Sequence, residues 1–497
     1  MPRRRKNILL ITADEMRADC TGFGGSNDAR TPNLDALAAR ATSFAGHFTT
    51  FAKCVPARCS MLTGRHPHTD GLRSVSPDNH LPPPTPELAG CLRAAGWQTA
   101  VLGLNHVWEE DWFYGGGDRK NEPGAGVVDM TSFTRGIAQL ATATAHFPAG
   151  TPRAEPPELR RVEFKGLISG DRADFNDVNR ASQAVCWLRE FRDPARPFYL
   201  QLNLSNPHPP YAAPEPFYSS FDPAGLEAFP FALPEHAPLC VRAQRHWRFG
   251  DDASEAAMRE IRAVYLAMIA FADAQIGRVL DALRDMGLED DTLVVFTSDH
   301  GDYAGQHGLV EKWDTDFRDC LLRVPLLFAG PDIPRGELRD GLSDHTDLAD
   351  TLLEMCGVEP SPGWNRHGCS LVPMIAGGAG KDAVFASGGH EAALRRRFPQ
   401  QADAMLARGP LKDKQRTYLE CPESMARAKM IRTRDWKLVV RETGDDELYH
   451  LARDPWEMRN MHGDPGHLAV VAELQRHLLD WVLRTDPDLP RLETFGA

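Results

Sequence analysis

Continuous apolar runs and segments of helical periodicity alternate along most of the chain. Five short apolar runs, bounded by polar or turn-forming residues, are typical of strands buried on both faces. They lie at residues 7–12, 99–102, 198–204, 292–297 and 324–328. The segments between them predict helices at residues 31–41, 85–95 and 254–286. Strands that alternate with helices predict a large, mostly parallel α/β sheet sandwiched by helices.

The pattern changes near residue 376. Residues 429–441 and 447–451 are typical of antiparallel strands, and an amphipathic helical stripe follows them. The stripe consists of Leu468, Val471, Leu474, Leu478, Trp481 and Val482. The sequence therefore predicts a main α/β domain over residues 1–375. It also predicts a smaller α+β subdomain over residues 376–497, with antiparallel strands and a terminal helix.

Two long segments interrupt the alternation of strands and helices. Residues 109–165 contain three consecutive glycines at 115–117 and show little periodicity, and residues 214–251 are rich in proline and aromatic residues. Irregular segments of this length inside a compact domain are usually either functional or disordered. We expect both to form walls or lids of a pocket.

Composition narrows the classes of function. The chain has 497 residues and a formal net charge of −13, which argues against nucleic acid as a partner. Its ten cysteines include no CxxC pair and do not form a disulfide framework. The first apolar run, at residues 8–11, is too short for a signal sequence, and no apolar run appears long enough to span a membrane. We expect a cytoplasmic protein with no membrane partner.

The stretch CVPARCSMLTGR, residues 54–65, carries the first candidate chemistry. Pro56 suits the first turn of a helix, so Cys54 would lie at the positive end of that helix. Arg58 would point back towards Cys54. Such a site favours an anion, and a negatively charged transition state even more. The alternative is a buried structural cysteine in front of a helix.

Acidic residues follow two of the predicted strands. Asp14 and Glu15 come after the first, and Asp299 and His300 come after the run at residues 292–297. Ligands of parallel α/β sheets bind beyond the carboxyl ends of the strands, and oxygen ligands suit a hard divalent cation. The alternatives are a solvated acidic turn and a loop histidine that has its own hydrogen-bond partners.

These stretches together resemble the sulfatase family and its phosphonate- and phosphodiester-cleaving relatives. The family signature is Cys-x-Pro-x-Arg followed by Leu-Thr-Gly-Arg, as at residues 54–65. Asp-His, Gly-x-His-Gly and a lysine follow a later strand, as at residues 299–312. Ser205–Pro210 resembles the Pro-His segment of the family, and residues 447–455 resemble its Glu-Leu-Tyr and Asp-Pro motifs. The resemblance spans nearly the whole chain and implies the fold of alkaline phosphatase, with the catalytic domain at residues 1–375.

The resemblance also implies a mechanism and a set of site residues. Cys54 would be oxidised by a formylglycine-generating maturation enzyme, and the hydrate of formylglycine would attack a small anionic ester. One divalent metal would assist, calcium in a sulfatase or manganese in a phosphonate or phosphodiester hydrolase. The implied metal ligands are Asp14, Glu15, Asp299 and His300. The implied catalytic residues are Cys54, Arg58 to orient the nucleophile, His106, His208 as general acid, and Lys312.

Three positions depart from the family pattern. Leu104 replaces a lysine that binds sulfate in many sulfatases, Glu15 replaces the usual Asp or Gln, and Cys59 replaces a small Ala or Ser. The loss of that lysine argues against sulfate specificity, but the resemblance as a whole still leads us to expect a sulfate ester hydrolase. A phosphonate monoester or phosphodiester hydrolase, a catalytically silent binding relative and a hydrolase with an unmodified cysteine nucleophile are the alternatives, and a homo-oligomer is left open.

Overall fold

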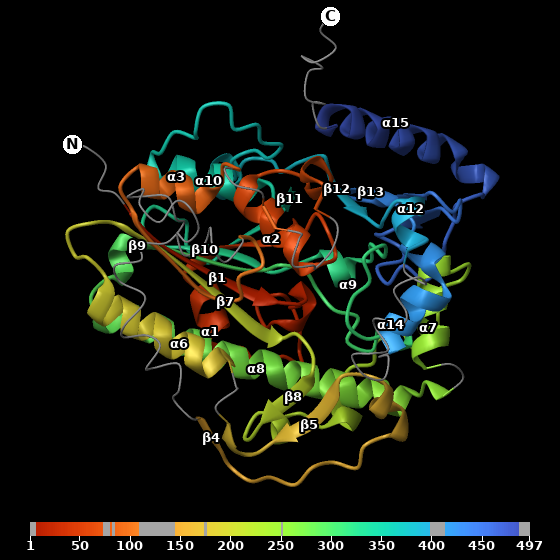
Figure 1. Ribbon diagram of the computed structural model, residues 1–497, viewed down its shortest axis with the longest axis horizontal. Helices are drawn as coiled ribbons and strands as arrows, with labels where there is room; N and C mark the ends of the chain where they lie inside the picture. The colour runs from red at the N-terminus through yellow and green to blue at the C-terminus, as the bar shows by residue number, and fades with distance from the viewer. Residues whose placement is uncertain are drawn as a thin grey trace, which may run out of the picture.

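A central seven-stranded sheet, covered by helices on both faces, forms the main body of the protein (Figure 1). The computed structural model describes residues 6–72, 80–81, 85–108, 145–172, 176–249, 252–397 and 413–486. The strand order is β11-β2-β10-β9-β1-β7-β3, and β10 alone runs antiparallel to its neighbours in this sheet. The strands are β1 (Asn7–Asp14), β2 (Ala41–Phe48), β3 (Gln98–Gly103), β7 (Phe198–Pro207), β9 (Thr292–Ser298), β10 (Leu326–Ala329) and β11 (Glu337–Asp344). The predicted α/β class and mostly parallel sheet are confirmed.

The apolar run of β1 explains why both faces of the sheet are covered. Ile8 and Leu10 pack into one hydrophobic core, whereas Leu9 and Ile11 pack into the other. Side chains alternate between the two faces of a strand, so a strand buried on both sides is apolar throughout. A continuous apolar run at this position therefore requires helices on both faces.

The helices form two layers. The helices α1 (Pro32–Ala38), α6 (Asn176–Cys186) and α8 (Glu255–Asp285) cover one face, and α2 (Cys54–Thr63), α3 (Leu88–Ala94) and α10 (Asp347–Cys356) cover the other (Figure 1). The short helices α9 (Asp319–Leu322) and α11 (Val372–Ile375) connect strands. By length and composition alone α8 could cross a membrane, but 89% of its apolar stretch is buried inside the molecule, as in a core helix.

A second, antiparallel sheet occupies the C-terminal part of the chain. Its order is β12 (Ala383–Gly388), β13 (Ala428–Thr433), β14 (Trp436–Arg441) and β15 (Glu447–His450), and α15 (Leu468–Thr485) packs on it. The helices α12 (Ala392–Arg395) and α14 (Asp413–Glu420) lie in the connection between β12 and β13. Val384 and Met430 of this sheet share a core with Trp313 and Phe317 of the main body. The C-terminal part is therefore joined to the main body by a common apolar core.

Some element boundaries differ from the prediction. The helix expected at residues 31–41 ends at Ala38, because Ala41 begins β2, a strand that the apolar runs did not indicate. Of the first long insert, residues 109–144 lie outside the described residues. The rest of it forms β4 (Ala145–Phe147) and β5 (Phe164–Ile168), which pair with β6 (Gly170–Arg172) and β8 (Tyr211–Pro214). The second insert contains α7 (Leu239–Arg248).

Candidate active site

The carboxyl ends of the three parallel strands β1, β7 and β9 converge on one region of the molecule. Ala13 of β1 is paired with Ser298 of β9, so Asp14 and Asp299 emerge side by side at the same edge of the sheet. On the other side of β1, Asp14 is paired with Pro207 at the end of β7. The register of the sheet therefore brings together the Asp14, Asp299 and His208 segments, which are far apart in the sequence.

Cys54 is the first residue of α2 and faces this edge. Pro56 lies in the first turn of the helix as predicted, and Gly64 ends the helix in the left-handed conformation (φ 65°) that favours glycine. The Cys54 side chain is buried, with Sγ 3.3 Å from His300 Nε2 and 3.5 Å from Asp14 Oδ1. Cys59 instead packs in the apolar core beside Met61 and Leu62, so it does not face the site.

Arg58 lies one turn further along α2 and is completely buried. Its Nε donates to Asp299 Oδ2 at 2.8 Å, and Nη2 lies 3.3 Å from Asp14 Oδ2. Burial alone would raise the pKa of Asp14, but His208, Arg58 and other neighbouring cations hold that pKa far below its ordinary value. The guanidinium therefore holds two of the predicted metal ligands in place beside Cys54.

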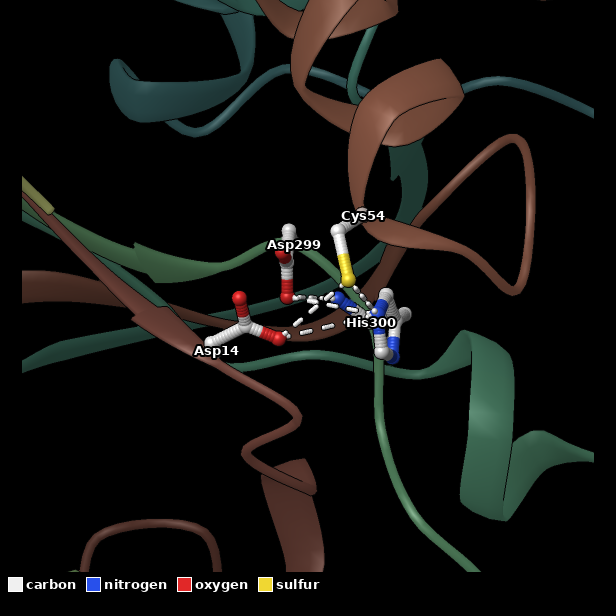
Figure 2. A group of neighbouring side chains, drawn as sticks. All are labelled: Asp14, Cys54, Asp299 and His300. Atoms are coloured by element: carbon white, nitrogen blue, oxygen red, sulfur yellow. Dashed lines mark hydrogen bonds and ion pairs between the residues drawn. The ribbon is translucent and has the colours of Figure 1, made fainter. Parts of the chain in front are cut away.

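Asp14, Cys54, Asp299 and His300 point towards one another (Figure 2), and their ligating atoms all lie within 4.8 Å of one another. The Glu15 carboxylate is not part of this cluster. It contacts the Lys312 ammonium and lies 3.4 Å from His208 Nε2, and it shares a second possible cluster with Asp14 and His208. Buried carboxylates with one imidazole form a donor set that is mainly hard oxygen, which fits a divalent metal.

The backbone at Glu15 is held in an uncommon conformation. Its φ is 70°, in the left-handed region that side chains rarely adopt. Three hydrogen bonds hold it there: Glu15 N donates to Asp299 Oδ1, Met16 N donates to Ser298 Oγ, and the Tyr265 hydroxyl donates to the Glu15 carbonyl. Tyr265 belongs to α8, and no local sequence signal marks it as part of the site.

A buried carboxylate positions the His208 segment. Asp177 of α6 accepts hydrogen bonds from the backbone N–H groups of Ser205 and Asn206 at 2.7 and 2.8 Å. Following this turn, His208 Nδ1 lies 2.6 Å from the Pro209 carbonyl oxygen. A carbonyl only accepts, so Nδ1 carries a proton and Nε2 is the atom directed at the site. Asp177 was not identified from the sequence because its segment has no recognisable motif.

A cavity of about 1050 Å³ opens beside Cys54. Of the predicted site residues, Asp14, Cys54, His106, His208 and Lys312 line it, and so does Leu104. Lys53 and Lys414 also line the cavity and were not predicted. Lys53 directly precedes Cys54 in the sequence, so it could have been predicted as a neighbour of the site. Lys414 belongs to α14, far along the chain, and no sequence signal places it there.

Two lysines of the cavity wall are each paired with a carboxylate. The Lys53 ammonium lies 2.7 Å from Asp314 Oδ1, and Lys414 lies 2.7 Å from Glu311 Oε2. Burial and the nearby Lys414 lower the pKa of Lys312 to about 7. Burial and the Arg58 charge lower the pKa of His106 to about 4, so its imidazole is neutral at pH 7.

The unmodified Cys54 thiol is poorly suited to act as a nucleophile. Burial and the carboxylates of Asp14 and Asp299 raise the pKa of this thiol well above its ordinary value. Cysteine nucleophiles need a lowered pKa, because the thiolate is the reactive form. The geometry therefore disfavours the hydrolase with an unmodified cysteine.

A family model and two curated relatives match most of this chain. A family model described as Sulfatase matches residues 6–358. The multifunctional alkaline phosphatase superfamily protein PehA of Trinickia caryophylli is 28% identical, with 96% of this chain and 95% of that protein covered. A choline-sulfatase of Rhizobium meliloti (strain 1021) is 27% identical, with 94% of this chain and 84% of that protein covered.

Solved structures agree with the fold. A phosphonate monoester hydrolase of Agrobacterium radiobacter superposes with a TM-score of 0.73 at 25% identity, covering 97% of this chain and 96% of that one. A 2-O GAG sulfatase superposes with a TM-score of 0.69 at 22% identity, covering 97% and 93%. The second likeness concerns the fold alone.

Proposed function

The chain belongs to the sulfatase family, and on that premise we propose that it hydrolyses a sulfate ester of a small molecule with a nucleophile derived from Cys54. One observation carries the proposal. Cys54 begins α2 at the sheet edge where Asp14, Asp299 and His300 place their ligating atoms within 4.8 Å of one another and of its sulfur. A nucleophile at a helix N-terminus beside a cation site suits attack on an anionic ester.

The carboxylates and the histidine of the site would bind a metal. Asp14, Asp299 and His300 would hold a divalent metal, with Glu15 adjacent to them, and that metal would neutralise charge on the ester oxygens. Arg58 holds Asp14 and Asp299 in place. Calcium is the expected ion for a sulfatase, because the ligands are mainly hard oxygens.

Formylglycine at position 54, made by a maturation enzyme, would supply as its hydrate the oxygen nucleophile that the thiol does not provide. His208 Nε2 faces the cavity and would carry the proton for the leaving alcohol, since Nδ1 is directed at the Pro209 carbonyl. The ammonium groups of Lys53, Lys312 and Lys414 line the same cavity and would bind the charged ester.

The mass of the peptide that carries Cys54 tests this proposal most directly. In protein produced together with a formylglycine-generating enzyme, we expect a loss of about 18 Da relative to cysteine. Aryl sulfate turnover should rise in proportion to the modified fraction, and protein made without that enzyme serves as the control. Full activity in completely unmodified protein would contradict the proposal, whereas a thiol that resists maturation would favour a catalytically silent relative.

A phosphonate monoester or phosphodiester hydrolase is the second candidate. Leu104 lines the cavity where many sulfatases carry a lysine, which leaves this part of the wall apolar. The Agrobacterium radiobacter phosphonate monoester hydrolase has a similar structure. Comparing kcat/KM for matched aryl sulfate and aryl phosphonate esters, with calcium and with manganese, distinguishes the two activities.

A further inference from the structure

The wall of the cavity beyond the reacting centre carries positive charge on the side of His208. Strand β5 of the first insert pairs with β8, which begins one residue after Pro210, and Tyr211 N donates to the Glu163 carbonyl at 2.7 Å. The two strands lie side by side (Figure 1). Arg160 and Lys165 flank this contact, and both line the cavity. They therefore lie on the side where His208 would protonate the departing alcohol.

Neither Arg160 nor Lys165 has a carboxylate partner among the described residues, and both side chains are exposed to solvent. Arg161, which lies between them in the sequence, is already paired. Its Nη2 lies 2.6 Å from Asp252 Oδ2, and its Nη1 donates to the Phe249 carbonyl at 2.7 Å. Two cations are thus available at the mouth of the cavity.

Acidic residues on this wall do not cancel that charge. Glu311 is paired with both Lys414 at 2.7 Å and Arg248 at 3.7 Å, so this group of three has a net charge of +1. Glu163 is the other carboxylate of the lining near Arg160 and Lys165. Counting Arg160, Lys165 and the Glu311 group against Glu163 leaves a net charge of +2.

We propose that this wall binds a second anionic group of the substrate, so that the preferred esters are those whose alcohol part carries a carboxylate or another oxyanion. This inference rests on the proposed sulfatase activity and specifies its substrate class. The cavity, at about 1050 Å³, is large enough for an organic alcohol beyond the ester group. A net positive wall attracts an acidic alcohol and repels one that carries a quaternary ammonium group.

Three phenyl sulfates that differ only in the para substituent test the inference. The substituents are carboxymethyl, carbamoylmethyl and trimethylammoniomethyl, which are anionic, neutral and cationic. In the mature enzyme we expect the highest kcat/KM for the carboxymethyl ester and the lowest for the trimethylammoniomethyl ester. The advantage of the carboxymethyl ester should shrink as salt is added, because solvent-exposed charges are screened.

The double variant Arg160→Gln/Lys165→Gln should lower the ratio of kcat/KM for the anionic over the neutral ester about threefold to tenfold. The matched control Arg434→Gln/Arg476→Gln removes two exposed arginines that do not line the cavity, and it should leave the ratio unchanged. Equal use of the three esters, a preference for the cationic ester, or an unchanged ratio in the double variant would overturn this inference alone. Turnover of none of them would contradict the proposed function and this inference with it.

Discussion

At the scale of single residues, the site combines buried carboxylates with buried basic side chains. Arg58 contacts both Asp14 and Asp299, and Lys312 contacts Glu15. Removing one partner of such a buried group leaves the other uncompensated, which is costly. Single substitutions in the site should therefore change metal content and specificity, and they need controls for folding.

The first prediction concerns the metal. Asp299→Asn keeps the shape of the side chain but removes the charge of one expected ligand. We expect the purified variant to retain at least tenfold less divalent metal than the wild type, since even indirect partners of a metal site change affinity by about 10–100-fold. Elemental analysis after dialysis measures the metal content. Asp70→Asn, at an aspartate paired with Arg65 outside the site, is the control, and equal metal in all three proteins would remove Asp299 from the site.

The second prediction concerns Leu104. An ammonium at this position would add positive charge to a cavity that Leu104 lines. We expect Leu104→Lys to raise the ratio of kcat/KM for aryl sulfate over aryl phosphonate by about tenfold or more, the size expected of a cation near a developing oxyanion. Leu104→Met is the uncharged control. If the ratio is the same in both variants, the side chain at position 104 does not reach the anion.

At the scale of elements, the functional side chains lie at the ends of strands and at the start of a helix. Strands β1, β7 and β9 end at one edge of the sheet, and α2 begins there. The helix α3, on the same face as α2, starts from a buried cap. The carboxylate of Glu87 accepts hydrogen bonds from Ala89 N and Gly90 N at 2.7 and 2.6 Å.

The third prediction follows from this cap. Burial raises the pKa of Glu87 from 4.5 to about 7 in spite of its backbone hydrogen bonds. The folded state thus prefers the protonated acid. The contribution to stability is complete below pH 4.5 and is lost as the pH rises through 7. A difference of 2.5 pKa units corresponds to about 3 kcal/mol.

The variant Glu87→Gln cannot ionise, so its stability relative to the wild type should increase between pH 5 and pH 8. Urea denaturation of both proteins at the two pH values measures the difference, and all other titrating groups cancel in the comparison. A stability difference that stays constant with pH would mean that Glu87 titrates alike in the folded and unfolded chain.

At the scale of the whole molecule, the C-terminal sheet and the main body share buried charge as well as an apolar core. Lys437 of β14 is completely buried. Its Nζ lies 2.6 Å from both Asp319 Oδ1 and Glu457 Oε1, and it donates to the Phe317 carbonyl at 2.8 Å. Asp319 and Phe317 belong to the main body. The boundary near residue 376 stays a prediction, and the parts of the chain on its two sides share these buried contacts.

The fourth prediction tests this connection. Lys437→Met should lower the free energy of unfolding by about 3–5 kcal/mol, because Glu457 stays buried without its cation and Asp319 keeps only Arg432. Arg434→Met is the matched control. That arginine pairs with Asp340 at an exposed position of the same hairpin, and its loss should cost less than about 1 kcal/mol. Thermal unfolding measures the loss of stability in the two variants, and equal losses would contradict a buried role for Lys437.

The local sequence pattern was sufficient to predict much of the fold and the candidate residues at the centre of the site. Continuous apolar runs indicated β1, β7 and β9, since a strand buried on both faces has no polar face. Asp14, Cys54 and Asp299 were recognisable because each lies at the end of such a strand or at the start of a helix. Strand β2 was not recognised, because Thr42 and Ser43 interrupt its apolar residues although both are buried. The assigned roles and the cytoplasmic location stay predictions.

The sequence by itself determined which chemical groups lie at the ends of the strands, because hydrophobic periodicity and turn residues act within a few positions along the chain. Only the tertiary structure decided what surrounds them. Lys414 contacts Glu311 across 103 positions of the chain, and the Glu15 carboxylate contacts Lys312 and lies beside His208. Such contacts depend on how distant segments pack, and no local pattern encodes that packing. The charge of the cavity wall, and with it the proposed acidic substrate, therefore became visible only in the folded chain.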